Sequence, residues 1–469
     1  GRAIAEEVLD VGANFFGGVC VNLPYHPGWG RAQEVYGEDP YLLGRMGSAL
    51  VRGVQENGVI ACVKHFAFNS MENARFKVSI ECDKRTEREI FFSHFKKCID
   101  AGAGSVMSAY NRYQGAMCGE NEYLLRQVLR NEWDFDGFTI CDFVWGVKDT
   151  VASASSGLDI EMPITHFYGE KLLEVVREGE VTEQTIDESA LRIIRTLLAH
   201  EHFIEEHKKE GSCDYRKHQE LAREGITLLK NEDQLLPIDC KKGKKIVVLG
   251  SYADRENIGD RGSSQVYAPY VVTILQGITE YPSDAEVIYY SGESASHCRR
   301  LAKEADVVVI VAGNDYLDAV VVLVGGSMIL MDEWEDQVGA ILMAYYPGME
   351  GGKAVADVLF GKTNPGGKLP FVIPKKEEDL PEIDWDAEEF RYDYYHGYTL
   401  LNKNHVEPLY PFGYGLSYTT FTLTGMKAWR DEENLYASVI AKNTGKREGS
   451  EVVQMYVGAA DSKVERPEY

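Results

Sequence analysis

Four short clusters of polar and aromatic side chains end or follow apolar runs of the sequence. They are residues 26–40 (HPGWGRAQEVYGEDP), Lys64-His65-Phe66, residues 107–111 (MSAYN) and Cys141-Asp142-Phe143. If Asp142 lies near Arg31 and Lys64, it stays ionised at neutral pH, because neighbouring cations favour the charged form of a carboxyl group. An ionised carboxylate is what a nucleophile in covalent catalysis requires. The alternative for an isolated aspartate at such a place is a cap on the next helix.

The first cluster also contains groups that suit a sugar. Arg31 presents a rigid fork of donors to hydroxyls or carboxylates, and Trp29 could stack on the apolar face of a sugar ring. The alternative is that Arg31 pairs with Glu34 or Glu38 and only holds a loop in place. From the sequence alone, both roles of Arg31 stay open.

The second and third clusters add cations and a ring. Lys64 and His65 end a predicted strand, and adjacent cations rarely end a buried strand without an anionic or polyhydroxyl partner. A binding role is therefore favoured over a structural ion pair. Tyr110 offers a ring and one hydroxyl to a pyranose, although packing in the core is the more common use of such a tyrosine.

Other catalytic motifs are absent from the sequence. It contains neither G-x-G-x-x-G nor G-x-x-x-x-G-K-[ST], and it has no H-E-x-x-H and no G-x-S-x-G. Phosphate-binding, zinc-hydrolase and serine-hydrolase chemistry therefore lose support. No cofactor and no metal ion is expected.

The elements that must position these clusters alternate up to about residue 200. Candidate strands are residues 14–22, 59–66, 105–110, 137–142 and 158–162, and helix-like runs between them include residues 86–101 and 123–132. The alternation predicts a parallel sheet, and polar residues at the carboxyl ends of its strands predict an active face of the barrel type. Because a closed (β/α)₈ barrel needs eight strands, residues 1–200 are interpreted as a barrel catalytic domain without its N-terminal strands.

A charged linker over residues 201–217 precedes a second α/β domain, residues 218–410. Its candidate strands are residues 245–250, 286–290, 306–312, 319–325 and 340–345, all apolar as buried parallel strands are. Over residues 411–469 the pattern changes to alternating runs, at residues 418–424, 434–441 and 451–457. These runs predict the first strands of a small antiparallel sandwich.

One junction in the second domain is too short for its pattern. Residues 306–312 and 319–325 both look like buried parallel strands, but only six residues separate them, and a parallel crossover takes a dozen or more. Either the strands form an antiparallel hairpin, or residues of the native protein near 316–318 are absent from this sequence. The second interpretation is favoured, because the loop GNDYLD lacks hairpin turn chemistry such as Asn-Gly.

Composition excludes several classes of function. Lys and Arg number 49 against 74 Asp and Glu, a net charge of −25 over 469 residues, and so acidic a surface repels nucleic-acid phosphates and anionic lipids. No apolar run of 18 residues occurs, and the first residues lack a signal-peptide pattern. The nine scattered cysteines include no C-x-x-C, which favours reduced thiols and a cytoplasmic location.

The clusters and their surroundings resemble glycoside hydrolase family 3, most closely its bacterial β-glucosidase branch. The motifs follow one another in family order over nearly the whole chain: GWGRAQEVYGEDP, CVKHFAFNSMENAR, SVMSAYNRYQGAMCGEN, GFTICDF, SGLDIEMP, GITLLKNEDQLLP, GDRGSSQVYAPY, YYPGMEGGKAVADVLFG, NPGGKLP and PLYPFGYGLSYT. The resemblance implies a (β/α)₈-type barrel, an α/β sandwich domain and a fibronectin-III-like domain, of which residues 411–469 would be the start.

The resemblance also implies roles for single residues. Asp142 matches the family's nucleophile. Residues that match the lining of the −1 sugar subsite are Arg31, Lys64, His65, Met107, Tyr110 and Ser263, the last from a loop of the second domain. The implied reaction is retaining, exo-acting hydrolysis of terminal β-D-glucosyl residues, in which Asp142 forms a glycosyl-enzyme and a second carboxyl acts as acid and then as base.

Two departures from the family concern the pocket wall and the acid/base dyad. Phe143 follows Asp142 where the family usually has tryptophan, and the tryptophan comes later at Trp145, so one wall of the pocket is expected to differ. Ala67-Phe68-Asn69 stands where the family's N-acetylglucosaminidase branch has P-G-H-G. A His/Asp acid–base dyad on that loop is therefore not expected.

The largest departure concerns the acid/base residue itself. In related β-glucosidases this glutamate lies in a long loop after the strand that corresponds to residues 306–312, and that loop is not in this sequence. Glu333, Glu335 and Glu350 are near in sequence, but they match positions that the family uses structurally. The acid/base is expected to come from the absent segment.

The expected partner is a small β-glucoside or an oligosaccharide, with no nucleic acid and no membrane, and a homodimer stays open. A β-xylosidase or broader β-glycosidase is one alternative, because selection by one hydroxymethyl group is worth only about 1–3 kcal/mol. A catalytically inactive sugar-binding homologue is the other. The aromatic run of residues 392–398 could flank a plus subsite or pack between domains.

Overall fold

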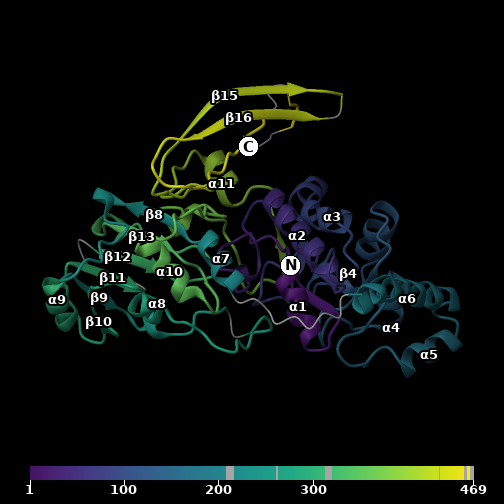
Figure 1. Cartoon of the computed structure of the whole chain (residues 1–469). Helices are drawn as coiled ribbons and strands as arrows, with labels where there is room; N and C mark the ends of the chain where they lie inside the picture. The colour runs from purple at the N-terminus through teal and green to yellow at the C-terminus, as the bar shows by residue number, and fades with distance from the viewer. Residues whose placement is uncertain (207–215, 260–261, 312–318, 433, 459–461, 465–469) are drawn as a thin grey trace. The chain divides into compact units, whose positions relative to one another are not determined.

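The computed structural model describes residues 1–206, 216–259, 262–311, 319–432, 434–458 and 462–464 (Figure 1). The chain divides into two compact units. The first joins Gly1–Cys213 to Pro381–Gly397, and the second joins Asp214–Leu380 to Tyr398–Tyr469. The sequence pattern places residues 381–397 in the second domain, whereas the structure places them in the first unit.

The first unit alternates strands and helices. Its strands are β1 (Phe15–Cys20), β2 (Ile60–Phe66), β3 (Ser79–Glu81), β4 (Ser105–Ser108), β5 (Arg112–Tyr113), β6 (Ala116–Met117), β7 (Phe138–Ile140) and β14 (Glu389–Arg391). Its α-helices are α1 (Arg2–Asp10), α2 (Pro40–Gln55), α3 (Ser93–Asp100), α4 (Thr150–Ser156), α5 (Glu170–Arg177) and α6 (Glu183–Glu206). Shorter or π-helical segments are η1 (Ala32–Glu34), η2 (Thr86–Phe92), η3 (Cys118–Glu120) and η4 (Tyr123–Glu132).

Four strands of the first unit form a parallel sheet in the order β1-β2-β4-β7. These are four of the five strands that the sequence predicts. The fifth, residues 158–162, makes only one isolated bridge, between Ile140 and Ile160. The carboxylate of Asp159 accepts a hydrogen bond from the backbone N–H of Thr139 at 2.7 Å. This N–H of β7 is therefore not available to a backbone carbonyl of a fifth strand.

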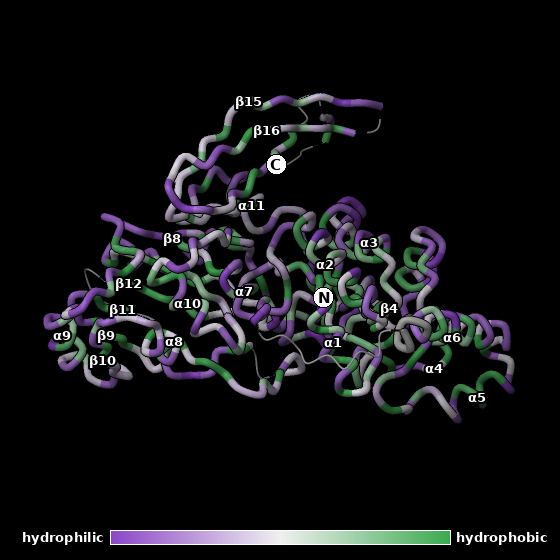
Figure 2. The backbone as a smooth tube through the Cα atoms, viewed as in Figure 1, coloured by the Kyte–Doolittle hydropathy of each residue, from purple (hydrophilic) through white to green (hydrophobic). Residues whose placement is uncertain are grey.

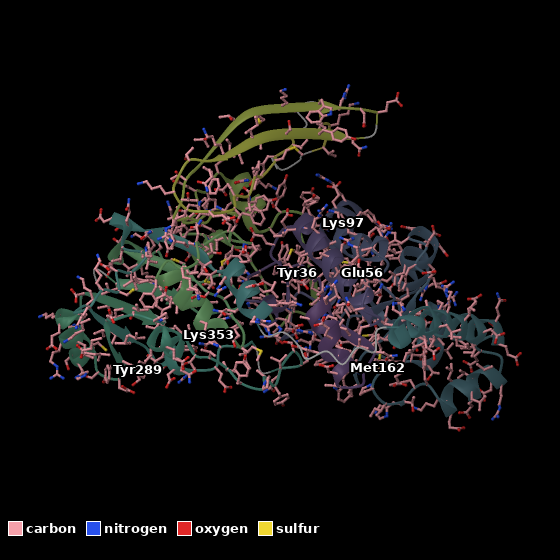
Figure 3. All side chains as sticks on the ribbon, viewed as in Figure 1. Tyr36, Glu56, Lys97, Met162, Tyr289 and Lys353 are labelled. Atoms are coloured by element: carbon pink, nitrogen blue, oxygen red, sulfur yellow. The ribbon has the colours of Figure 1, made fainter. Side chains whose placement is uncertain are left out.

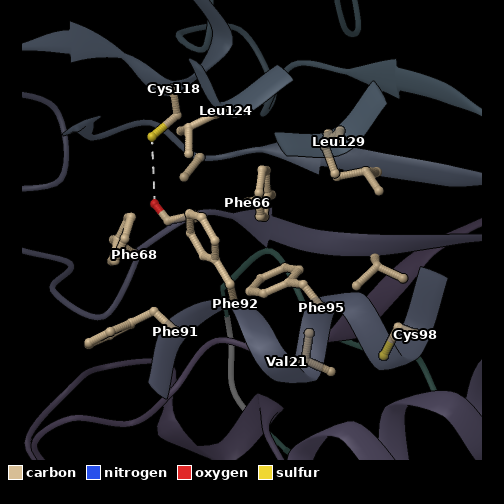
Figure 4. Packing of buried hydrophobic residues seen from close by; sticks show 14 of the residues in the cluster. Val21, Phe66, Phe68, Phe91, Phe92, Phe95, Cys98, Cys118, Leu124 and Leu129 are labelled. Atoms are coloured by element: carbon tan, nitrogen blue, oxygen red, sulfur yellow. Dashed lines mark hydrogen bonds between the residues drawn. The ribbon is translucent and has the colours of Figure 1, made fainter. Parts of the chain in front are cut away.

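Helices on one side of this sheet bury a large aromatic core. Phe66 of β2 contacts Phe92 and Phe95, with ring centroids 5.2 Å apart in both pairs (Figure 4). Helix α2 begins where the carboxylate of Asp39 accepts the N–H of Leu42 at 2.7 Å, with Pro40 at the first helical position. A smaller cluster on the other face of the sheet contains Met107.

Residues 381–397 complete the first unit from a distant part of the chain. Strand β14 pairs in parallel with β3. Just beyond it, Tyr392 is fully buried, and its ring stacks on that of Phe91 at 4.9 Å and lies 4.7 Å from that of Tyr25. Tyr392, the first ring of the aromatic run, therefore packs into the core of the first unit. This differs from both predicted roles of the run, a plus subsite and packing between domains.

The second unit is built on a sheet in the order β10-β9-β11-β12-β13-β8. Its strands are β8 (Thr227–Asn231), β9 (Lys245–Leu249), β10 (Glu286–Tyr290), β11 (Val307–Val311), β12 (Ala319–Leu323), β13 (Ala340–Met343), β15 (Phe421–Arg430) and β16 (Leu435–Asn443). Its helical segments are α7 (Arg216–Gly225), η5 (Glu232–Gln234), η6 (Ser251–Asp254), α8 (Ile274–Glu280), α9 (Ala295–Glu304), η7 (Glu335–Gln337), α10 (Gly351–Leu359), η8 (Glu377–Asp379) and α11 (Gly397–Asn404).

Successive residues of these strands point to opposite faces of the sheet. Val309 and Val311 of β11 belong to the core that includes α8 and α10, whereas Val308 and Ile310 belong to the core beside α9. Figure 2 shows the hydrophilic colour over much of α9. In Figure 3, Lys353 marks α10 and Tyr289 marks β10. The unit is therefore a three-layer α/β sandwich, as the apolar strands predict.

The short junction of the second unit lies between two parallel strands. Strands β11 and β12 pair in parallel from Val308 opposite Ala319 to Val311 opposite Val322. The hairpin alternative is therefore wrong. Residues 312–318, where the absent segment is predicted, lie outside the described residues.

The C-terminal region contains one antiparallel ribbon, β15 paired with β16. The third predicted strand, residues 451–457, is not a strand in the structure. The Glu451 carboxylate accepts a hydrogen bond from the N–H of Val452 at 2.8 Å and pairs with Lys368 at 2.7 Å. The N–H of Val452 is therefore not available to a neighbouring strand. A fibronectin-III-like sandwich is thus not confirmed by this ribbon.

No helix in the described part of the chain is long and apolar enough to cross a membrane. The eight cysteines of that part are all unpaired, and five of them are fully buried in the first unit, at positions 20, 62, 98, 118 and 141.

Candidate active site

The carboxyl ends of four neighbouring parallel strands bring the predicted cluster together in the first unit. Asn22 follows β1, Lys64 and His65 lie near the end of β2, Tyr110 follows β4, and Asp142 follows β7. Since the carboxyl ends of parallel strands meet at one edge, residues far apart in sequence become neighbours. The peptide bond between Lys64 and His65 is cis.

Asp142 follows β7, the outermost strand of this sheet, and is 6% exposed. Its Oδ1 accepts the backbone N–H of Phe143 at 2.8 Å. Its Oδ2 is buried without a hydrogen-bond partner among the described residues, and the Nε2 of His65 lies 3.6 Å away. One oxygen of the carboxylate is thus held, while the other is left for a ligand.

The loop that carries Asp142 is fixed by the segment after it. The N–H of Val144 donates to the carbonyl of Met162 at 2.8 Å, and the N–H of Met162 reaches the Sγ of Cys141 at 3.1 Å. Met162 is labelled in Figure 3. The N–H of Gly146 donates back to the carbonyl of Asp142 at 3.2 Å, and a side chain at Gly146 would collide with that oxygen. The loop therefore has little freedom to move the carboxylate.

Burial raises the pKa of Asp142 to about 6. The N–H of Phe143, the charge of Arg31, the hydroxyl of Tyr110 and the charge of Lys64 each lower it, but together they offset only part of the burial effect. The sequence predicts a carboxyl that stays ionised at neutral pH, but it does not show how deeply this carboxyl is buried. At pH 7 a group with this pKa is still mostly ionised.

Two cations near Asp142 share one carboxylate, that of Glu34. Arg31 binds it with two hydrogen bonds, Nε to Oε1 at 2.7 Å and Nη2 to Oε2 at 2.9 Å. The Nζ of Lys64 lies 3.6 Å from Oε2. Burial alone would raise the pKa of Glu34, but Arg31 and Lys64 outweigh it and hold that pKa below its usual value. Of the two pairings considered for Arg31, the structure forms the one with Glu34.

His65 is held by Asn22, a residue that the sequence does not single out. The N–H and the Nδ1 of His65 both lie 2.8 Å from the Oδ1 of Asn22, and the Nδ2 of Asn22 donates to the carbonyl of His65 at 2.9 Å. Burial lowers the pKa of His65 well below its usual value, and Arg31, Lys64 and Arg75 lower it further. The histidine is therefore neutral, and the cations of the site are Arg31, Lys64 and Arg75.

One wall of the site is aromatic. The hydroxyl of Tyr110 donates to the carbonyl of Phe143 at 2.6 Å, and the guanidinium of Arg75 lies over the Tyr110 ring at 5.0 Å. The ring of Phe76 lies 4.9 Å from that of Tyr110. Beyond Asp142, Phe143 is 41% exposed, so its ring is available to a ligand. Arg75 and Phe76 are not among the site residues predicted from the sequence. The spacing of Glu72 and Arg75 could have indicated Arg75, because these two residues form an i,i+3 ion pair.

The structure does not support a stacking role for Trp29. Its side chain is only 2% exposed, and its Nε1 donates to Glu72 at 3.1 Å. The indole thus packs beneath the site and offers no free face. By contrast, Trp145 is 55% exposed and follows Asp142 by three residues. The aromatic surface next to the nucleophile position is therefore carried by Phe143 and Trp145.

Two predicted site residues have other surroundings. Met107 is 4% exposed and lies in the apolar cluster with Phe138 and Ile140, on the face of the sheet opposite the aromatic core. Ser263 belongs to the second unit, where it is exposed in a turn beside residues 260–261, which lie outside the described residues. The predicted approach of Ser263 to the pocket stays a prediction.

The glutamates near the short junction are occupied elsewhere in the second unit. Glu335 accepts from the hydroxyl of Tyr410 at 2.6 Å and pairs with Lys230 at 3.5 Å, and Glu350 pairs with Lys353 at 2.9 Å. Glu333 is exposed. No group of three or more potential metal ligands is present among the residues that the structure describes.

The cluster thus combines one buried carboxylate with a free oxygen, a neutral imidazole, cations and aromatic rings. A carboxylate with a free oxygen can act as a nucleophile, and cations, imidazole and rings are suited to hydroxyls and to the apolar face of a sugar. This combination favours a polyhydroxyl ligand over a phosphate, since the carboxylate would repel an anion.

Two family models match the chain. The model described as "Glycosyl hydrolase family 3 N terminal domain" matches residues 1–196. The model described as "Glycosyl hydrolase family 3 C-terminal domain" matches residues 226–318 and 316–418, as two stretches that meet at the short junction.

Individual relatives agree with these models. Thermostable beta-glucosidase B of Acetivibrio thermocellus is 35% identical over 524 positions, which cover all of this chain and 68% of the relative. A beta-xylosidase of Formosa agariphila is 30% identical over 92% of this chain and 70% of its own length. A solved structure of beta-glucosidase 3B from Thermotoga neapolitana in complex with glucose superimposes with a TM-score of 0.90 at 31% identity, over all of this chain and 76% of that one.

Proposed function

Because this chain belongs to glycoside hydrolase family 3 and is a glycoside hydrolase, we propose that it is a retaining, exo-acting β-glucosidase with Asp142 as its nucleophile. The substrate would be a terminal, non-reducing β-D-glucosyl residue. The observation that carries the proposal is the Oδ2 of Asp142, which is buried without a partner among the described residues and lies at the carboxyl edge of the sheet beside Arg31, Lys64 and His65.

The proposed reaction has two displacements. In the first, the Oδ2 of Asp142 forms a bond to the anomeric carbon while the bond from that carbon to the leaving oxygen breaks, and the acid/base gives the leaving oxygen a proton. In the second, water attacks the same carbon, gives a proton back to the acid/base and releases Asp142. Arg31, Lys64, His65, Tyr110 and Phe143 would form the −1 subsite, and the contribution of Ser263 stays a prediction.

The acid/base would come from a segment absent from this sequence near residues 316–318. Three observations support this part of the proposal. Strands β11 and β12 are parallel neighbours, which a direct connection of a few residues does not suit. The C-terminal family model matches as two stretches that meet there. The alignment with the Acetivibrio relative runs over 524 positions against 469 residues, so the relative has stretches without a counterpart here.

The finer fold belongs to the same proposal. The four parallel strands of the first unit would be part of a (β/α)₈ barrel, and the ribbon β15-β16 would be part of a fibronectin-III-like sandwich. The order β1-β2-β4-β7, with helices between consecutive strands, supports the barrel.

A second candidate is a β-xylosidase or broader β-glycosidase. A relative that is 30% identical carries the name beta-xylosidase, and a xyloside differs from a glucoside only by one hydroxymethyl group. The other alternative, an inactive sugar-binding homologue, is not supported, because the family models and the relatives identify the chain as a glycoside hydrolase.

The test is a panel of aryl β-glucoside, β-xyloside and β-N-acetylglucosaminide, with the intact protein and its Asp142→Asn variant. We expect the glucoside to have the highest kcat/KM, and we expect Asp142→Asn to lower it at least about 1,000-fold, because the charge is lost and the volume is kept. Residual activity within tenfold of the parent would contradict the role of Asp142. A higher kcat/KM for the xyloside would favour the second candidate, and no hydrolysis of any of the three substrates would contradict the proposed activity.

A further inference from the structure

The amide of Asn22 makes three hydrogen bonds to one residue, His65. The backbone N–H of His65 lies 2.8 Å from Oδ1, the backbone carbonyl lies 2.9 Å from Nδ2, and the ring Nδ1 lies 2.8 Å from Oδ1. Both residues are 1% exposed. Because the amide of Asn22 is buried and both its oxygen and its nitrogen are hydrogen-bonded, it has one orientation.

The backbone of His65 decides that orientation. Its N–H can only donate, so the atom of Asn22 that faces it must be the oxygen, and its carbonyl can only accept, so the facing atom must be the nitrogen. The same oxygen faces Nδ1. Nδ1 must therefore carry the hydrogen, and in a neutral ring Nε2 then carries a lone pair.

The charges around the ring keep it neutral. The groups that face it are Arg31, Lys64 and Arg75, which disfavour imidazolium, and Asp142, which is the carboxylate within 4 Å among the described residues. Burial lowers the pKa of His65 well below its usual value, and the three cations act in the same direction. Nε2 is thus an acceptor at neutral pH.

Nε2 and the Oδ2 of Asp142 are two acceptors 3.6 Å apart, and Oδ2 has no hydrogen-bond partner among the described residues. Two lone pairs cannot bond to each other, so this corner of the site needs a donor from a ligand. A sugar hydroxyl is such a donor. The hydroxyl of Tyr110, which also acts on Asp142, donates its hydrogen to the carbonyl of Phe143 at 2.6 Å and so does not fill this role.

We propose that Asn22 is a positioning residue that holds His65 as its neutral Nδ1–H tautomer, so that Nε2 accepts a hydrogen bond from one hydroxyl of the sugar. The inference rests on the proposed function. It assigns His65 the role of acceptor for one hydroxyl, and it makes recognition of that hydroxyl depend on a residue that does not touch the substrate.

The chain offers a matched control for Asn22. Asn231, in the second unit, makes the same backbone clamp on Leu236: its Nδ2 donates to the carbonyl at 2.9 Å, and its Oδ1 accepts the N–H at 2.8 Å. No imidazole takes part in that clamp. Asn231→Leu therefore reports what the loss of such a clamp does to folding alone.

The experiment crosses Asn22→Leu with aryl β-glucosides that each lack one hydroxyl, using the intact protein. In the parent, we expect removal of the hydroxyl bound by Nε2 to lower kcat/KM by about 10- to 100-fold, since a buried acceptor is left unsatisfied. In Asn22→Leu, the loss for that one hydroxyl should shrink to less than about threefold, while the losses for the others stay as in the parent. A variant that loses kcat/KM equally for all substrates would overturn the proposal.

A second measurement covers the case in which Asn22→Leu does not fold. ¹⁵N NMR of histidine-labelled parent protein, with the His65 signal assigned by its absence from His65→Gln, reports which ring nitrogen is protonated. The proposal requires protonated Nδ1 and unprotonated Nε2 at pH 7. The opposite tautomer or an imidazolium would overturn it, even if the parent hydrolyses aryl glucosides. A parent that hydrolyses none of them contradicts the proposed function instead, and the NMR result still decides the tautomer.

Discussion

At the scale of single residues, the proton on Asp142 decides when the proposed reaction can begin. The carboxyl must be ionised to attack, and burial raises its pKa to about 6. We therefore expect kcat/KM for an aryl β-glucoside to rise with pH through an acid limb near pH 6. A pH profile of the intact protein measures this limb. A limb near pH 4, the usual range of an aspartate, would show that the carboxyl is not buried as described.

The same raised pKa has a consequence for stability. A carboxyl whose folded-state pKa lies above its unfolded value of 3.8 favours the folded state below that value, and the contribution is lost as pH rises through about 6. An asparagine at position 142 does not ionise, so its contribution to stability does not fall as the pH rises. Asp142→Asn should thus be more stable than the parent at pH 7, by at most about 3 kcal/mol, and the gain should vanish near pH 4. Urea unfolding at both values compares the two proteins.

Glu34 is the residue that holds two cations beside Asp142. In Glu34→Gln, Arg31 and Lys64 lose their shared carboxylate, while their charges still act on Asp142. We expect the free energy of unfolding to fall by about 3–5 kcal/mol, because a buried pair is broken. We also expect the acid limb to move below pH 6, since freed cations favour the charged form of Asp142.

The control for Glu34→Gln is Glu132→Gln. Glu132 also receives two hydrogen bonds from one arginine, Arg88, but its side chain is about one-third exposed and it is the last residue of η4. An exposed pair of this kind contributes at most about 1 kcal/mol, so activity and acid limb should not change. If the acid limb of the pH profile stays near pH 6 in Glu34→Gln, Glu34 does not influence the pKa of Asp142 and has only a structural role.

Most of the candidate site could be predicted from residue types at strand ends. Arg31, Lys64, His65, Tyr110 and Asp142 lie where polar residues follow apolar runs. Asn22 lies at such a place as well, but an asparagine there has no special signal, and its role appears only when the neighbouring strand brings His65 to it. Stacking of Trp29 on a sugar is possible from the sequence alone, but the ring is buried, and burial of a ring is not visible in the sequence.

At the scale of elements, strands with a continuous apolar run could be predicted and short strands could not. Strands β1, β2, β4 and β7 carry their pattern locally. The three-residue strand β14 pairs with β3, more than 300 positions away, and its own residues show no pattern. The predicted strands at residues 158–162 and 451–457 are not strands in the structure, and near each of them a carboxylate accepts a backbone N–H.

The return of residues 381–397 to the first unit should be measurable as stability. Tyr392→Ala removes a fully buried ring that stacks on Phe91, and it should cost about 3–5 kcal/mol. Tyr436→Ala on the ribbon is the control, because this ring also stacks, on Trp429 at 5.5 Å, but is 38% exposed. Its cost should be about 1 kcal/mol or less. Equal costs in urea unfolding would mean that Tyr392 does not belong to the core.

At the scale of the whole molecule, the chain order of motifs predicts the α/β sandwich and the parallel sheet, but not the two units as they are. The chain passes from the first unit to the second, returns for residues 381–397 and passes over again. No local sequence pattern predicts that residues 381–397 return to the first unit, because the periodicity of a segment describes only that segment.

The central claim is that Asp142 forms a covalent bond to the sugar. Incubation of the intact protein with dinitrophenyl 2-deoxy-2-fluoro-β-glucoside tests it directly, because the good leaving group needs little acid assistance and the fluorine slows hydrolysis of the intermediate. We predict that the mass increases by one fluoroglucosyl group, and that peptide mapping finds this group on Asp142. A label on another residue, or hydrolysis of aryl β-glucosides with inversion and no label, would contradict the account.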